Sequence, residues 1–231
     1  MNQTDNSSTL FEAMARFPEE PALLKSLLAQ GSWSGETVTR VAIQYVQACD
    51  NEDGGYYEAG PSGAASDRPL SNALPDLISL LLPYGLDPNA VYDGDNLMYR
   101  VCWVNAGFAA ADALALLLAH GGDPMVSIDG EPLFDRIDFD VVFGAFEMYN
   151  RQRYSAVVHC WLVLVGYGGR PPRGETALKV FRKFDSDETF DCAELKDHRR
   201  FTYGLSRVPG RGESWSLQIF DRQTMWEVAR L

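Results

Sequence analysis

The residue types that could carry out chemistry are few in this chain, and their spacing suits no known site. His159 adjoins Cys160 in an apolar stretch, and Cys192 precedes His198 by six positions. Thiols and imidazoles bind zinc, but neighbouring residues on a helix point about 100° apart, and these spacings fit no zinc finger. We therefore expect no metal site.

Motifs for nucleophilic, phosphate-binding or calcium-binding chemistry also fail. The segment 31–35 has Trp33 at its centre, where a nucleophile elbow requires serine. The glycine-rich segment 166–169 follows a predicted helix instead of a strand, and the acidic segment 89–100 ends in Arg100 where a calcium loop needs glutamate. The sequence thus predicts no catalytic residue and no cofactor.

Two alternatives with an active site stay open. Asp138 and Asp140 form a carboxylate pair, which could serve glycoside hydrolysis only inside a cleft with substrate-binding aromatic residues. The other alternative is an enzyme whose site lies in the carboxy-terminal part. Its candidate groups are the side chains of Asp185, Asp187, Glu188, Asp191 and His198.

A repeat of 36 residues is the clearest pattern in the chain. The segment 80–88 (LLLPYGLDP) returns as 116–124 (LLLAHGGDP), and 93–98 (DGDNLM) returns as 129–134 (DGEPLF) in the same register. A fixed period of about 20 to 50 residues is typical of stacked units that bury a face against each other and bind proteins. The pattern makes protein binding the leading hypothesis.

The layout of each copy resembles the ankyrin repeat. An apolar helix ends at a glycine, an Asp-Pro turn follows, and a short polar tip leads into the next helix. Residues 131–134 (EPLF) stand where ankyrin repeats have Thr-Pro-Leu-His, and 95–98 (DNLM) is a poorer copy. The resemblance implies a mainly α fold, an ankyrin-like helical repeat solenoid, in which the hydroxyl and imidazole of that motif are missing.

Weaker copies flank the two good ones, so we expect divergent repeats over residues 10–172. They end at Gly31 upstream and at the turn 166–171 downstream, which follows its predecessor by 47 residues and implies an insertion. Residues 10–30 and 37–49 are predicted as a helix pair. Residues 173–231 are predicted as a capping region, because 201–208 and 215–219 alternate like a β-hairpin and 225–231 favours a third strand.

Acidic charge is concentrated in the repeats. Residues 50–147 contain seventeen acidic and three basic residues, which gives this segment a net charge of −14. Residues 148–231 carry +4, and the whole chain carries −12. Nucleic acid is a poor partner for such a surface because phosphate binding depends on Lys and Arg. A basic protein would suit it, although acidity for solubility alone is an equal alternative.

The predicted binding residues lie at the polar tips and in a long loop. Tips of neighbouring repeats lie side by side in such solenoids, so their carboxylates could face a partner together. Paired tyrosines flanked by acidic residues are good interface anchors, although a plain loop explains them as well. The set comprises Tyr56, Tyr57, Asp93, Asp95, Asp129 and Glu131.

A further resemblance covers about half the chain. The run 133–141 (LFDRIDFDV), the turn 166–169 (GYGG) and the terminal 215–221 (WSLQIFD) are similar to small bacterial ankyrin-like proteins, some of which accompany polymorphic toxins. The resemblance implies an immunity protein that binds and neutralises a basic toxin domain. A scaffold without a toxin partner is the alternative that sequence does not separate from it.

Composition sets the remaining expectations. The chain is 46% apolar, enough for a core, and residues 1–8 resemble no targeting signal. No apolar run is long enough to span a membrane. Four cysteines without regular spacing are predicted to be reduced and mostly buried. We expect a soluble cytoplasmic protein that is not an enzyme and contacts neither membrane nor nucleic acid.

Overall fold

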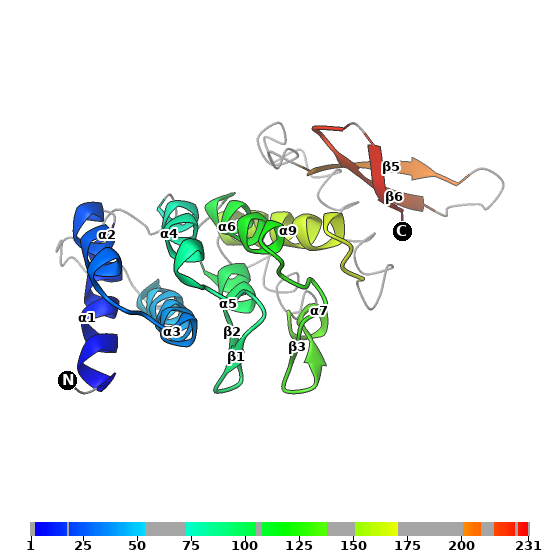
Figure 1. The fold of residues 1–231 in the computed structure, drawn as a ribbon. Coiled ribbons are helices and arrows are strands. Elements are labelled where there is room, and N and C mark those ends of the chain that lie inside the picture. Colours follow the sequence, from blue (N-terminus) through cyan, green and yellow to red (C-terminus); the bar gives the residue numbers. More distant parts are fainter. Residues whose placement is uncertain are drawn as a thin grey trace, which may run out of the picture. The chain divides into compact units, whose positions relative to one another are not determined.

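The computed structural model divides into two compact units, Met1–Asp123 and Pro124–Leu231. Its described parts are rich in helices and end in a three-stranded antiparallel sheet, as predicted (Figure 1). The predicted division at residue 172 lies outside the described residues. The structure describes residues 3–17, 19–53, 73–104, 108–137, 151–170, 201–208, 215–224 and 226–230.

The first unit begins with three helices, α1 (Gln3–Ala15), α2 (Pro21–Gln30) and α3 (Gly35–Asp53). The prediction of one helical segment over residues 10–30 is wrong. Helix α1 ends at Ala15, and a new helix begins at Pro21. A proline ring fits the first position of a helix but would break its interior. Helix α1 packs against both α2 and α3.

The remainder of this unit is a helix, a hairpin and two more helices. Pro83 lies in a 3-10 turn that follows the first of these helices. Figure 1 shows α2, α4 and α6 in one row and α3 and α5 in a second row, from which the hairpin projects. The elements are α4 (Leu74–Leu81), η2 (Leu82–Tyr84), β1 (Val91–Tyr92), β2 (Asp95–Asn96), α5 (Leu97–Trp103) and α6 (Phe108–Ala119).

The second unit has a similar hairpin, a long helix and the terminal sheet. Helix α9 contacts all three strands of the sheet, and Leu217 and Ile219 on β6 are fully buried. The predicted hairpin and third strand are confirmed, in the order β5-β6-β7. The elements are β3 (Ser127–Ile128), β4 (Glu131–Pro132), α7 (Leu133–Arg136), α9 (Arg151–Gly166), β5 (Phe201–Arg207), β6 (Trp215–Asp221) and β7 (Trp226–Arg230).

The cysteines that the structure describes are buried, as the sequence predicts. Cys49, Cys102 and Cys160 are buried and form no disulfide, whereas Cys192 lies outside the described residues. Within the described part of the chain, no helix is both long and apolar enough to cross a membrane.

Candidate functional site

Each unit contains one short hairpin with an Asp-Gly turn. In the first, Asp93 and Gly94 have positive φ angles of 52° and 74°; in the second, Asp129 and Gly130 have 53° and 85°. Two consecutive positive φ angles define the tight turn that joins two strands of right-handed twist, and Asp-Gly is a favoured pair for it. The sequence therefore builds the same tip twice.

The two hairpins correspond position by position after a shift of 36 residues. Val91 pairs with Asn96 in the first, and Ser127 pairs with Pro132 in the second. The helix that follows each hairpin starts one residue later, at Leu97 and at Leu133, both fully buried. The repeat seen in the sequence is thus also a repeat of local backbone structure.

Two helix ends repeat with a shift of 47 residues. The amides of Gly121 and Gly122 donate to the carbonyls of Leu118 and Leu117 at the end of α6. The end of α9 has the same two bonds, from Gly168 to Val165 and from Gly169 to Leu164. Gly121 and Gly168 both have a φ of 94°, and the pair of bonds is the Schellman motif. The glycine-rich segment 166–169 therefore ends helix α9.

The upstream copy ends differently. Gly31 closes α2 with an extended backbone, at a φ of −93° and a ψ of 150°. Ser34 then caps α3, because its Oγ accepts a hydrogen bond from the amide of Thr37. Ser34 has a structural role in a segment that only superficially resembled a nucleophile elbow.

Consecutive turns are joined by equivalent hydrogen bonds. In the first unit, the amide of Asp123 donates to Oδ1 of Asn89 (2.6 Å), and Nδ2 of Asn89 donates to the carbonyl of Gly121. In the second unit, the amide of Arg170 donates to the sulfur of Met125 (3.1 Å). Met125 lies 36 positions after Asn89, and Arg170 lies 47 after Asp123, so both contacts join the same repeat positions.

A glycine in each turn packs against the helix that follows the preceding hairpin. A Cβ on Gly122 would lie 3.0 Å from the sulfur of Met98, and a Cβ on Gly169 would collide with the ring of Phe134. Met98 and Phe134 are again 36 positions apart. Any larger side chain at Gly122 or Gly169 would push the turn away from α5 or α7, the helix against which it packs.

Asn96 holds the first hairpin together. It is fully buried, and its Nδ2 donates to the carbonyls of Pro88 and Ala90, both at 2.9 Å. Its Oδ1 accepts from the amides of Met98 and Tyr99, which caps α5. This network joins the turn before the hairpin to the start of α5. Residue 132, the equivalent position, is a proline and makes no side-chain cap.

An arginine in the helix after each hairpin pairs with a different tip carboxylate. Arg100 binds Asp95, which is only 7% exposed and also accepts a hydrogen bond from the amide of Asn96. Arg136, 36 positions later, pairs with Asp129 at 3.5 Å and donates to the carbonyl of Ile128. Each arginine neutralises one of the two acidic residues of its tip. The net charge of each tip therefore comes from the second acidic residue, which the arginine does not bind.

The predicted binding residues therefore do not form a uniform set. Asp93 and Glu131 are exposed and make no ion pair within the described residues. Asp129 is exposed as well, with its loose partner Arg136. The expectation that Asp95 is an exposed tip residue is wrong, because its carboxylate is engaged with Arg100 inside the repeat. Tyr56 and Tyr57 lie outside the described residues.

Burial and two carboxylates outside the tip raise the pKa of Tyr92, which precedes the first tip. Partial burial raises the pKa of its phenol first, and the carboxylates of Glu36 and Asp87 raise it further, while Arg40 lowers it. The guanidinium of Arg40 lies 4.9 Å from the centre of the Tyr92 ring and pairs with Glu36. The phenol therefore lies among carboxylates that one cation only partly compensates.

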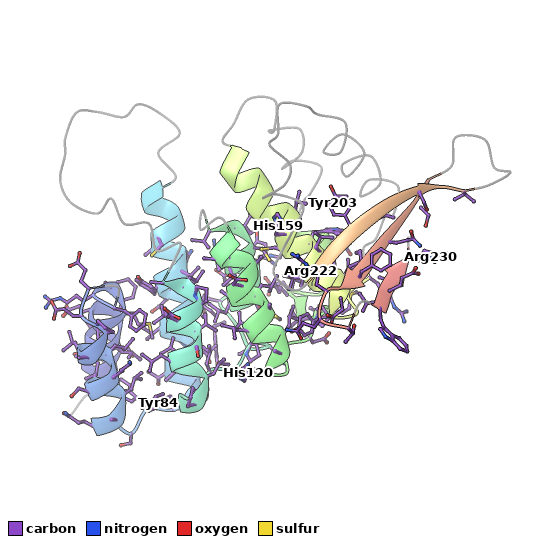
Figure 2. All side chains as sticks on the ribbon, turned by 90° about the horizontal axis from the view of Figure 1, so that it is seen from above. Tyr84, His120, His159, Tyr203, Arg222 and Arg230 are labelled. Carbon is purple, nitrogen blue, oxygen red and sulfur yellow. The ribbon has the colours of Figure 1, made fainter. Side chains whose placement is uncertain are left out.

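The groups considered for chemistry have structural places or lie outside the described residues. Nδ1 of His120, at the end of α6, contacts the carbonyl of Leu116 at 2.8 Å, as expected for a helix-ending imidazole (Figure 2). His159 is fully buried in α9. Asp138, Asp140 and the alternative enzyme residues of the carboxy-terminal part lie outside the described residues. Among those described, no three His, Cys, Asp or Glu side chains group as metal ligands.

Sequence reasoning missed Asn96 and the two arginines. An asparagine directly before an apolar helix is an N-cap signal, so Asn96 could have been found. The choice of acid by each arginine leaves no such signal. No protein-family model, no curated protein and no solved structure matches this chain. Its function has to be inferred from its own geometry and charge.

Proposed function

We propose that this chain is a protein-binding module built from ankyrin-like helical repeats, and that it acts as an immunity protein that neutralises a basic toxin domain. One observation carries the proposal. The same hairpin occurs twice, and each tip presents an exposed carboxylate, Asp93 in one and Glu131 in the other, that lacks an arginine partner among the described residues.

Repetition of contacts supports the ankyrin-like fold. Hairpin register, helix ends, turn-to-turn hydrogen bonds and glycine packing each recur at equivalent positions. Units that make the same contacts to their neighbours are the basis of solenoids, which bind partners along repeated surfaces. The sheet after α9 would then cap the apolar end of the stack, since α9 packs against its strands.

Charge supports a basic partner. Residues 50–147 carry a net −14, and two of their three basic residues, Arg100 and Arg136, are already paired with hairpin carboxylates. Uncompensated charge at an interface rim mainly accelerates association with a partner of opposite sign. The resemblance to toxin-associated ankyrin-like proteins supplies the class of that partner.

The test compares two variants with the same number of charge reversals. One carries D93K, D129K and E131K at the hairpin tips; the other carries E12K, E19K and E20K at exposed positions of α1 and of the connection from α1 to α2. The probe is an inactive form of the basic toxin domain encoded beside the gene of this chain. We expect the tip variant to associate about tenfold more slowly at low salt, and the control to keep most of the wild-type rate.

The same variants report on neutralisation in cells. Wild-type chain should restore growth to cells that express the active toxin, and the tip variant should restore less. Equal association rates for the two variants would show that the tips are only solvated surface. Failure of the wild-type chain to bind the neighbouring gene product at micromolar concentration would overturn the immunity proposal.

A further inference from the structure

Strand β7 forms an open edge of the terminal sheet. It pairs with β6 on one side, and within the described residues no strand pairs with its other side. The outward amides and carbonyls of such an edge can pair with another strand, and lysine, proline and bulges are features that hinder this pairing. The five residues of β7, WEVAR, contain no lysine and no proline, but they do contain one bulge.

Two apolar side chains are exposed on this strand. Trp226 is 75% exposed and Val228 is 41% exposed. Leu23 on α2 is the one other large apolar side chain in the described residues with comparable exposure. Tryptophan contributes strongly to protein interfaces, and an exposed tryptophan on an open edge indicates a surface that is covered when a partner binds.

A bulge sets which side chains of β7 share a face. Phe220 pairs with Glu227 while its neighbour Ile219 pairs with Ala229, so Val228 is an extra residue in β7. Glu227 and Arg230 consequently lie on the same face, where Arg230 donates two hydrogen bonds to Glu227, at 2.8 and 2.6 Å. Figure 2 shows Arg230 at the outer side of β7.

We propose that β7 pairs antiparallel with β7 of a second copy of this chain, which joins the two terminal sheets into one. With the two-fold axis between Val228 and Ala229, Glu227 lies opposite Arg230 of the partner subunit, and Arg230 lies opposite Glu227 of the partner subunit. Directly opposed residues must share a face, and these do.

Charge and register both favour this occupant. The strand carries one acid and one base, so two copies meet without net repulsion, and each charge faces its opposite twice by symmetry. A register shifted by one residue would oppose Trp226 to Arg230 of the partner subunit, and these side chains lie on different faces. The inference is independent of the proposed toxin partner, because it involves only copies of this chain.

The experiment measures the mass of the full chain by sedimentation between about 1 and 200 µM, a range that covers weak interfaces of small area. We expect the mass to rise from one chain to two. R230E and E227R should each weaken the dimer about tenfold, because like charges then face each other twice. The double variant E227R/R230E restores opposite charges and should return the affinity to near the wild-type value.

Controls separate pairing from folding. W226S should also weaken the dimer, whereas L23S and R40E, which alter an exposed apolar residue and an exposed ion pair elsewhere, should leave it unchanged. Circular dichroism confirms that each variant is folded. A wild-type chain that stays monomeric over the whole range would overturn the proposal. So would a charge swap that fails to restore pairing, or a mass that grows beyond two chains.

Discussion

The two hairpins share a backbone but are stabilised by different side chains. In the first, buried Asn96 makes four hydrogen bonds and Arg100 holds Asp95. In the second, the equivalent of Asn96 is Pro132, and the amide of Leu133 bonds instead to the carbonyl of Val126. Turn geometry and helix ends are therefore sufficient to define the repeat, while the polar network within it can be replaced.

The difference also changes which charge reaches solvent. Arg100 binds the second acid of its tip, and Arg136 binds the first acid of the other. Among the residues that the structure describes, the exposed carboxylate without an arginine partner is therefore Asp93 in one hairpin and Glu131 in the other. Equivalent positions in a repeat therefore need not have equivalent roles at a binding surface.

The largest expected effect comes from removing the polar network of the first hairpin. N96A deletes the cap of α5 and leaves the carbonyls of Pro88 and Ala90 without their donor, which should cost about 3 kcal/mol of unfolding free energy. P132A at the equivalent position removes no side-chain hydrogen bond and should cost below about 1 kcal/mol. Denaturant unfolding of the two variants measures both values, and equal costs would refute the contrast.

A second effect tests the glycines that let a turn pack closely against the helix beside it. G169A should cost about 2 kcal/mol, because its Cβ would collide with the ring of Phe134. G122A should cost less. Both new Cβ atoms would crowd a backbone carbonyl oxygen, of Leu117 at 2.9 Å and of Leu164 at 2.8 Å, but the side chain near Gly122 is the flexible thioether of Met98 instead of a ring. Thermal unfolding gives the order, and F134L should recover part of the loss in G169A. A larger cost for G122A would contradict the steric explanation.

Sequence predicted the features that depend on local chemistry. The glycines that end α6 and α9 and the terminal meander each follow from a few neighbouring residues, and each is present. The period of 36 located equivalent positions because backbone conformation repeats with it. The break between α1 and α2 also had a local signal in Pro21, which the apolar periodicity of residues 10–30 outweighed.

The features that sequence did not predict depend on which atoms meet after folding. Asp95 and Glu131 occupy one repeat position, yet one is buried and the other exposed. What decides between them is whether the arginine five residues later reaches back to the second acid of the tip or to the first. That choice depends on side-chain geometry in the folded hairpin, and the residue types in both copies permit either pairing.

A third effect isolates this choice of partner. D95N removes the buried charge that pairs with Arg100 and should cost about 1 kcal/mol, whereas E131Q should stay within about 0.5 kcal/mol. Paired denaturant melts at equal salt measure the difference. If E131Q proved the more costly, the carboxylate of Glu131 would have a partner that its exposure does not suggest.

The smallest effect concerns Tyr92, whose equivalent in the second hairpin is the fully buried Ile128. Partial burial first, and then Glu36 and Asp87, hold the pKa of Tyr92 above its ordinary value of about 10. When the pKa of a group is raised in the folded state, the protein is stabilised at pH values below the ordinary pKa, and this contribution is lost as pH rises through the folded pKa.

E36Q should lower the pKa of Tyr92, whereas R40Q should raise it, because Arg40 is the cation above the ring. Nuclear magnetic resonance titration of ring-labelled tyrosine, with Y92F to assign the signal, separates Tyr92 from the other nine tyrosines. Shifts in the opposite directions would show that Glu36 and Arg40 do not set the electrostatic potential at the phenol of Tyr92.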